Sequence, residues 1–561
     1  MKRLLMLLLC LASLPIPARG EFNVIEASIA DLQRAMASNT VSSRELVQQY
    51  LSRIAIYDRK LNAVITVNPN ALREADERDG ERAQGRVRGP LHGIPIALKD
   101  NIHTTDMPTT GGALAFDGFV PPYEATLVGN LRAAGAVIIA KTSMTELANW
   151  IAGPPTPMPG GYNAITGFGM NPYDPRRDPR EKTFDGRPVL LVGGSSSGIG
   201  TAANLWVANV GTETSGSLLV PANLTMLVTI KPTVGRISRY GIIPLTADQD
   251  TAGPMARTVA DAAILLGVLE DPQPDPRDPV KPCQPPPNRD YTPFFRREAL
   301  AGARIGIPRA FYYDRVLPPG STEPRGGLNA EQATVMRQAI DVLKQHGATI
   351  IDPADIPSIL DQDDSKNSLS WPICSGADGR KGNDGQCSVV FKYGMKRDFN
   401  KWLQSLGPTA PVKSLTELRD WNLAHKNAGA LKFGQAQLDN SDEMDVEADR
   451  ARYEADRAKD IALSAAHGID AIMKSERLDA LLFPAASGAL LSARPGYPTV
   501  MVPFGSVPNA PSPPLPEGFN AKPSPFGVSF AGSACSEPRL IELAYAFEQA
   551  TRKRVPAAAT P

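Results

Sequence analysis

The sequence lacks an excess of charge of either sign. Its 59 lysine and arginine residues match its 59 aspartate and glutamate residues, so the formal net charge at pH 7 is zero. A chain without a basic surplus has no long-range field that would attract nucleic acid or an anionic membrane. We therefore expect no nucleic-acid partner. Hydrophobic residues make up 42% of the chain, which is enough for a large core.

Long hydrophobic runs are also missing, with one short exception at the N-terminus. The run Leu4–Leu14 follows a basic pair and precedes two prolines and small residues ending at Gly20. It is too short to span a bilayer, and its pattern is typical of a secretory signal. We expect a signal peptide over residues 1–20 and a mature domain over 21–561, located in the periplasm or secreted. A buried N-terminal helix is the alternative.

Cysteine and histidine are scarce, with five of each. Cys374 and Cys387 flank a polar, glycine-rich segment, and in an oxidising compartment they could close it as a disulfide. A loop of this size gains about 3 kcal/mol in the chain-entropy model. Two free thiols are the alternative. No histidine pair lies near these cysteines, so we expect no zinc site and no other metal site.

Short apolar runs bounded by glycine alternate with helical patterns in the first half of the chain. Uninterrupted β-branched runs of this kind indicate an α/β sheet covered on both faces. Two helices are expected within Ser28–Tyr57, the second opened by a capping box at Ser42 and Glu45. The expected strands are Ile94–Leu98, Val137–Ala140, Val189–Val192 and Val207–Val210.

The second half begins with a proline-dense stretch over residues 271–293, which indicates an extended connector. A strand–helix–strand pattern follows, and then a polar, helical and loop-rich region over residues 361–457. The remaining expected elements are strands at Ala303–Ile307, Ala348–Ile351, Leu478–Phe483 and Thr499–Pro503 and helices at Glu331–His346 and Pro538–Arg552. We expect the late strands to join the same sheet.

Two serine–glycine segments follow two of the expected strands. The first is GGSSSGIG at 193–200, which opens a helix, and the second is GTETSGS at 211–217. Consecutive free backbone N–H groups in such turns can hold an anion. The anion could be a bound phosphate or the transient oxyanion of an acyl-transfer reaction.

The phosphate interpretation matches the dinucleotide fingerprint of short-chain dehydrogenases. Those enzymes also need a tyrosine followed by a lysine four residues later. None of the 13 tyrosines has such a lysine, and Tyr393 and Tyr453 have arginine there instead. No acidic residue closes a following strand to bind a ribose. The oxyanion interpretation is therefore favoured.

The two segments, together with IPIALKDN at 94–101, resemble the amidase signature family, and the form of GTETSGS is nearest to its peptide amidase branch. Further matching stretches are KPTVG at 231–235, DTAGPM at 250–255 and YPTVMVP at 497–503. The resemblance implies an α/β/α sandwich with a large mixed, mostly parallel sheet. It also implies a serine amidohydrolase that acts on linear carboxylic amides, releases ammonia and needs no cofactor.

Carried over by that resemblance, Ser217 is the nucleophile, Ser195 the bridging serine and Lys99 the general base. A serine hydroxyl attacks only when a base takes its proton. None of the five histidines stands in a glycine-framed serine motif. A lysine can act as the base if burial keeps it neutral, and Lys99 ends a strongly apolar strand. The resemblance therefore predicts an acyl-enzyme on Ser217.

The resemblance further implies an oxyanion hole made of the backbone N–H groups of Thr214, Ser215, Gly216 and Ser217. Losing one such donor typically costs about 3 kcal/mol of barrier. Ser195 would follow a cis peptide bond, a conformation usually kept only for function.

Two features depart from the family pattern. Ser217 lies 22 residues after Ser195, about two fewer than expected, and the shortfall falls in Ile199–Ala203. Many relatives also carry an arginine two residues after the nucleophile, where this chain has Leu219. A small acidic amide is therefore disfavoured as substrate. An uncharged or bulkier amide, such as an amidated peptide, is favoured, and the enzyme is expected to be a monomer or a homodimer.

Two other functions fit the same motifs. The first is the glutamine amidase subunit of a tRNA-dependent amidotransferase, a cytosolic complex, against which the N-terminal signal argues. The second is a binding protein that kept the fold and lost activity, against which the intact set of Lys99, Ser195 and Ser217 argues.

Overall fold

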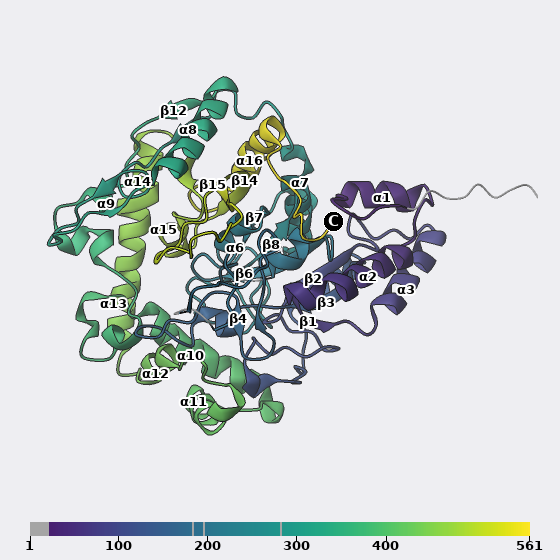
Figure 1. The fold of residues 1–561 in the computed structure, drawn as a ribbon, viewed down its shortest axis with the longest axis horizontal. Coiled ribbons are helices and arrows are strands. Elements are labelled where there is room, and N and C mark those ends of the chain that lie inside the picture. The colour runs from purple at the N-terminus through teal and green to yellow at the C-terminus, as the bar shows by residue number, and fades with distance from the viewer. Residues whose placement is uncertain (1–21, 182–184, 195–196, 281–282) are drawn as a thin grey trace, which may run out of the picture.

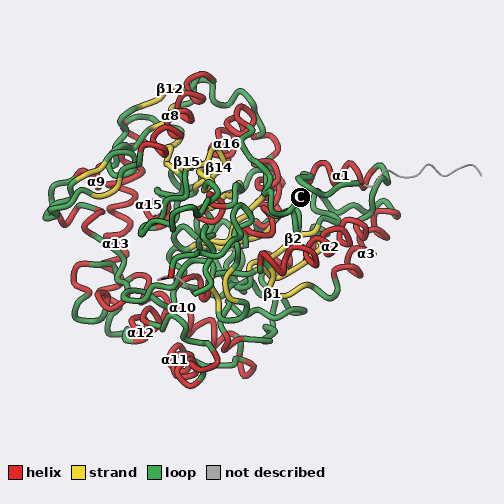
Figure 2. Tube along the Cα trace, viewed as in Figure 1, coloured by secondary structure: helices red, strands yellow, loops and turns green. Residues whose placement is uncertain are grey.

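The computed structural model describes residues 22–181, 185–194, 197–280 and 283–561. The predicted signal peptide and Ser195 lie outside the described residues. So does the peptide bond that the resemblance expects to be cis. Figure 2 shows centrally placed strands surrounded by helices.

An eleven-stranded sheet forms the centre of the molecule, in the order β1-β3-β2-β6-β8-β7-β14-β15-β13-β9-β12. Its strands are β1 (Val64–Val67), β2 (Pro95–Lys99), β3 (Val137–Thr142), β6 (Ala208–Glu213), β7 (Val228–Lys231), β8 (Thr251–Ala256), β9 (Arg304–Gly306), β12 (Thr349–Ile351), β13 (Ala480–Pro484), β14 (Thr499–Val507) and β15 (Ser524–Ala531). Two small sheets pair β4 (Tyr162–Asn163) with β5 (Gly167–Phe168) and β10 (Arg315–Val316) with β11 (Arg325–Gly326).

The α/β class and the mixed sheet are confirmed, but the expected parallel majority is wrong. Of the ten neighbouring pairs in the large sheet, four are parallel and six antiparallel. The antiparallel pairs lie in the middle of the sheet. There β14 and β15 are joined by a loop over residues 508–523, and β7 and β8 are joined by a segment without a helix. Antiparallel neighbours can be joined without a crossover over the face of the sheet, whereas parallel neighbours need a crossover of a dozen or more residues.

Helices cover both faces of the sheet, as expected. Along β14, Val500 and Val502 share a hydrophobic core with Leu540 of α16, whereas Met501 packs with Leu219 of α6 on the other face. The helices are α1 (Ile29–Ala37), α2 (Ser43–Leu61), α3 (Ala71–Ala83), α4 (Thr126–Ala133), α5 (Gly198–Ala202), α6 (Leu219–Leu224), α7 (Val259–Leu269), α8 (Ala330–Gln345), α9 (Pro357–Leu360), α10 (Val390–Ser405), α11 (Leu415–Ala424), α12 (Ala436–Asp442), α13 (Arg450–Ile461), α14 (Asp470–Ser475), α15 (Ala489–Ala493) and α16 (Glu537–Thr551). Figure 1 shows α10–α12 together at one end, away from α8 and α16.

The two helices predicted near the N-terminus are confirmed. Ser42 caps α2 by accepting from the backbone N–H of Glu45, and the Glu45 carboxylate accepts from the backbone N–H of Ser42 at 2.7 Å. This reciprocal pair satisfies two N–H groups that the helix itself leaves unpaired.

The strand predicted at Val189–Val192 is wrong. The segment belongs to a long loop and not to the sheet, and the Val189 N–H donates to the Arg176 carbonyl at 2.9 Å. Val189, Leu190 and Val192 are buried, with Val192 close to the Gly161 loop, so burial without strand pairing produced the same pattern.

The described residues of the proline-dense segment, 271–280 and 283–293, contain no α-helix and no strand of the large sheet. They form turns, an isolated bridge between Asp275 and Asp278, the 3-10 turn Pro287–Arg289 and the start of a second 3-10 turn, Thr292–Phe294.

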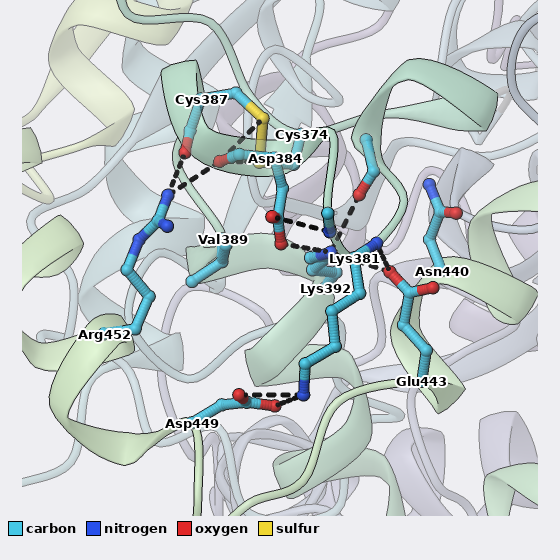
Figure 3. Close-up of polar contacts among 12 residues, drawn as sticks. Cys374, Lys381, Asp384, Cys387, Val389, Lys392, Asn440, Glu443, Asp449 and Arg452 are labelled. Atoms are coloured by element: carbon cyan, nitrogen blue, oxygen red, sulfur yellow. Dashed lines mark hydrogen bonds and ion pairs between the residues drawn. A yellow bond between two sulfur atoms is a disulfide. The ribbon is translucent and has the colours of Figure 1, made fainter.

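The predicted disulfide between Cys374 and Cys387 is confirmed, with an S–S distance of 2.09 Å. The loop that it closes packs over α10, where the fully buried Lys392 ammonium donates to the Gly379 carbonyl at 2.8 Å. The same ammonium pairs with Asp384 of the loop at 3.0 Å and with Glu443 at 2.9 Å. Figure 3 shows these carboxylates around Lys392 beneath the disulfide. The loop thus neutralises a cation buried in the helical region.

Two further cysteines, Cys283 and Cys535, form a second disulfide that the sequence did not predict. It joins the proline-dense connector to the loop before α16. In the part of the chain that the structure describes, no helix combines the length and apolarity needed to cross a membrane.

Candidate active site

The candidate base lies at the carboxyl end of β2. This strand is fully buried and pairs in parallel with β3 on one side and β6 on the other. Lys99 is its last residue, so its side chain lies beneath the turn that follows β6. The ammonium contacts Thr212 of β6 twice, with 2.8 Å to the hydroxyl Oγ1 and 3.2 Å to the carbonyl oxygen.

Burial changes the protonation of this lysine. The Lys99 side chain is fully buried, and desolvation lowers its pKa from 10.5 to about 7. The carboxylates of Asp250 and Glu213 oppose that shift by favouring the ammonium. The balance allows a substantial neutral fraction near neutral pH, which is what a general base requires.

Glu213 closes the turn that carries the candidate nucleophile. It ends β6, so the expectation that no acidic residue closes a strand after the first serine–glycine segment is wrong, although its carboxylate is engaged by this turn. Its Oε2 accepts from the backbone N–H groups of Leu218 at 2.7 Å and Leu219 at 3.0 Å. Because Glu213 ends β6 and Leu219 begins α6, this carboxylate fixes the intervening residues as a tight loop. Gly216 within that loop has φ +96°, a left-handed conformation that favours glycine.

The first serine–glycine segment lies directly against Ser217. A Cβ placed on Gly194 would come within 2.5 Å of the Ser217 Oγ, so only glycine fits there. Thr145, just past β3, holds this segment: its N–H donates to the Gly194 carbonyl at 3.3 Å and its hydroxyl to the Gly193 carbonyl at 3.2 Å. Ser195 itself lies outside the described residues. Its predicted contacts with Lys99 and Ser217 therefore stay predictions.

The backbone N–H groups of Thr214, Ser215, Gly216 and Ser217 form no hydrogen bond with any residue that the structure describes. Such groups are costly to bury without an acceptor. Four successive N–H groups in a turn are able to receive a developing oxyanion, which is the role predicted for them.

The stretch in which the spacing between the two serines falls short forms a short helix and its end. Helix α5 has only five residues, Gly198–Ala202, and ends where Trp206 packs against Gly200. A Cβ on Gly200 would lie 2.0 Å from the Trp206 indole, so the glycine allows the indole to pack against this short helix just before β6 begins.

A cavity of about 230 Å³ opens beside the turn. Its polar base includes Asn101, Thr212 and Thr214. Its walls are largely apolar and aromatic, and α10, from the predicted helical region, contributes one of them. Other residues that line the cavity include Tyr123, Arg239, Tyr240, Ile243, Leu245, Asp278, Asp398, Lys401 and Trp402.

Three residues around this cavity were not predicted from the sequence. Asn101 donates from Nδ2 to the Thr212 Oγ1 at 3.0 Å, so Thr212 links Asn101 to Lys99. The Asp250 carboxylate accepts from the Thr214 hydroxyl. All three lie inside the family motifs, but nothing in the pattern assigned them contacts. Among the described residues, no cluster of three histidine, cysteine or acidic side chains could hold a metal ion.

Comparisons with known proteins identify the family to which the chain belongs. The Amidase family model matches residues 45–541. A probable amidase of Arabidopsis thaliana is 31% identical over 541 residues, which cover 95% of this chain and 92% of the relative. The crystal structure of the peptide amidase from Stenotrophomonas maltophilia matches with a TM-score of 0.77 at 36% identity, covering 96% of this chain and 99% of that one.

One further relative matches only part of the chain and is named for a different activity. A glutamyl-tRNA(Gln) amidotransferase subunit of Chloroflexus aurantiacus is 39% identical over 332 residues, 58% of this chain and 60% of the relative. The peptide amidase and Arabidopsis matches instead extend over nearly the whole chain.

The mixed sheet and the match to the Amidase family model define an α/β enzyme of the amidohydrolase class. The chain belongs to the amidase family, and the resemblance stated from its motifs is confirmed.

Proposed function

We propose that the protein hydrolyses the C–N bond of linear carboxylic amides through an acyl-enzyme on Ser217. The Ser217 Oγ bonds to the amide carbon while its proton passes through Ser195 to the neutral Lys99 amine. The proton then moves to the leaving nitrogen, the C–N bond breaks and ammonia departs. Water next attacks the ester, releases the carboxylic acid and restores the Ser217 hydroxyl.

The observation that carries this proposal is the position of Lys99. Its amine is fully buried on the strand next to β6, and its pKa is lowered to about 7. Among the described residues, burial without an ion pair is shared by Lys231 of β7, which donates to the Tyr497 carbonyl. What distinguishes Lys99 is therefore its contact with β6, the strand that leads into the Ser217 turn. In contrast to Lys141 on the neighbouring strand, which pairs with Asp100 at 3.1 Å, Lys99 contacts only Thr212 among the described residues.

The substrate we propose is an uncharged amide of some size, such as a peptide with an amidated carboxyl end. Leu219 stands where many family members carry an arginine for a substrate carboxylate, and it is buried. Tyr123, Tyr240 and Trp402 give the neighbouring cavity apolar walls. The similar solved structures include a peptide amidase.

The glutamine amidase of an amidotransferase complex is the second candidate, favoured by the 39% identity to the Chloroflexus protein. The two disulfides argue against a component of a cytosolic complex, because disulfides persist mainly in oxidising compartments. Glutamine as sole productive substrate would favour this candidate, whereas turnover of amidated peptides would exclude it as the main function.

The test is ammonia release from amidated dipeptides by the wild type and Ser217→Ala. We expect Ser217→Ala to lose at least about 10³-fold in kcat and to resist labelling by a fluorophosphonate. Ser368→Ala, on a short 3-10 turn that contributes nothing to the cavity, is the control and should match the wild type. Full turnover by Ser217→Ala would refute the mechanism. Wild-type protein that neither labels nor releases ammonia would indicate a binding protein.

We also propose that the protein is exported. The signal-like segment over residues 1–20 and the two disulfides support this location. N-terminal sequencing of the exported protein should begin near Glu21. Protein that retains Met1 and stays in the cytosol would contradict the proposal.

A further inference from the structure

Asp250 joins two parts of the candidate active site through a single carboxylate. Its Oδ1 accepts from the hydroxyl of Thr214, in the turn that carries Ser217. Its Oδ2 accepts from the backbone N–H groups of Leu245 at 2.8 Å and Thr246 at 3.0 Å. Leu245 lines the cavity, so one side chain connects the turn of the proposed nucleophile to the cavity wall.

The same residue is held at the sheet edge by its neighbours. It directly precedes β8, whose Thr251 is the antiparallel partner of Glu213 at the end of β6. Gln249, one residue earlier, donates from Nε2 to the Thr214 carbonyl at 3.1 Å. Thr214 is therefore tied to the 249–250 segment by two hydrogen bonds, one from its side chain and one to its backbone.

We propose that Asp250 is a positioning residue for amide hydrolysis: it holds the Ser217 turn in register with the cavity wall, and its negative charge sets the protonation of Lys99. This inference rests on the function proposed above, in which Lys99 is the base. Asp250 does not itself exchange a proton with the substrate in this scheme.

The charged groups around the pair determine the direction of the effect. Two acids act on Lys99: Asp250 and Glu213, which ends the neighbouring strand. Asp250 is in turn faced by Asp398 of α10, whose charge raises its pKa, and by Arg239 of the cavity mouth, which lowers it. Burial is the largest influence on Asp250 and raises its pKa to about 7, so its carboxylate is ionised mainly at and above neutral pH, the range in which Lys99 loses its proton.

The sign of the predicted pH effect follows from these charges. An anion near Lys99 favours the ammonium, so Asp250 keeps the lysine pKa higher than burial alone would. Only the neutral amine accepts the serine proton, and the acid limb of kcat/KM reports its deprotonation. Replacing Asp250 by a neutral residue should therefore move that limb to lower pH. A residue with only a structural role would leave the limb in place.

The experiment compares Asp250→Asn with the wild type, measuring ammonia release from an amidated dipeptide between about pH 5.5 and 9, a range that spans the acid limb. We expect the acid limb to shift down by about 0.5 pH units or more. We also expect the plateau kcat to fall at least about tenfold, because the turn is less well held. An unshifted limb overturns the electrostatic part, and an unchanged kcat overturns the positioning part.

Two further variants separate the two effects. Thr214→Val removes the hydroxyl bond and keeps the Asp250 carboxylate, so kcat should fall. Because that bond lowers the pKa of Asp250, its loss reduces the charge only in part, and the limb should shift down by less than in Asp250→Asn. Asp76→Asn removes a carboxylate that pairs with Arg44 on the surface, outside the cavity, so its limb should match the wild type. If Asp250→Asn does not fold, Thr214→Val carries the test of positioning, and a wild-type kcat in that variant overturns it.

Failure of this inference can be told apart from failure of the proposed function. If Ser217→Ala keeps its turnover, the mechanism itself is wrong. If Ser217→Ala is inactive and Asp250→Asn behaves as the wild type in both plateau and limb, only the role of Asp250 is refuted.

Discussion

Replacing Lys99 by methionine should make the protein inactive and, near neutral pH, more stable. Lys99 is fully buried, and its ammonium has no carboxylate within hydrogen-bonding distance among the described residues. Methionine has a similar length and no charge to desolvate, so it can fill the same space. The base would then be an example of function maintained at the expense of stability.

The magnitude follows from the change in pKa. A lysine whose pKa falls from 10.5 in the unfolded chain to about 7 in the fold destabilises the folded state at pH 7 by about 4 kcal/mol. Methionine also loses the two hydrogen bonds to Thr212, worth about 1 kcal/mol each. Lys99→Met should therefore be more stable than the wild type by about 2 kcal/mol at pH 7.

The advantage should depend on pH. Because the folded-state pKa is lowered, the unfolded chain binds more protons between pH 7 and 10.5, and wild-type stability rises through that window. The rise is about 1.4 kcal/mol per pH unit, so Lys99→Met should lose its advantage near about pH 9. Urea unfolding followed by tryptophan fluorescence at about pH 7, 8 and 9 measures this change. A stability difference that is the same at all three pH values would refute the reasoning.

Lys141 is the matched control. It is also fully buried, one strand away on β3, but it pairs with Asp100 at 3.1 Å. Lys141→Met would leave that carboxylate buried without its cation, which typically costs about 3–5 kcal/mol. Opposite signs for the two variants at pH 7 are the expected result.

Two further predictions concern the site and the disulfide loop. Gly194→Ala should abolish ammonia release while urea unfolding stays near the wild type, because its Cβ would press on the Ser217 Oγ; normal turnover would show that the contact yields easily. Replacing Cys374 and Cys387 together by serine should lower the unfolding free energy by about 3 kcal/mol in urea titrations. An unchanged midpoint would mean that the loop stays ordered through Lys392 and its carboxylates alone.

Local signals in the sequence were sufficient to predict several elements. The capping box at Ser42 and Glu45 places the start of α2, and the apolar run before Lys99 predicts β2. Both depend on neighbours within a few residues. The disulfide of Cys374 is of the same kind, because its partner is 13 residues away and the segment between them is glycine-rich.

Other features depend on contacts between distant residues, and the sequence does not contain a local signal for them. Cys283 and Cys535 are separated by 252 residues, so their pairing follows only from the fold. β8 was not predicted as a strand because Gly253 and Pro254 lie within it, and proline is usually excluded from a central strand. Pro254 nevertheless pairs with Val210 in the antiparallel ladder between β8 and β6.

The position of the candidate site follows from a change of strand direction in the sheet. β2 and β6 are parallel, so the end of β2 at Lys99 and the turn after β6 lie at the same edge. β8 runs antiparallel to β6, so its start, preceded by Asp250, returns to that edge. In open α/β sheets, ligand sites form where the strand arrangement changes. Here the change brings together Lys99 as the candidate base, the turn of the candidate nucleophile and Asp250, and a shift of β8 by one residue would turn Asp250 to the opposite face.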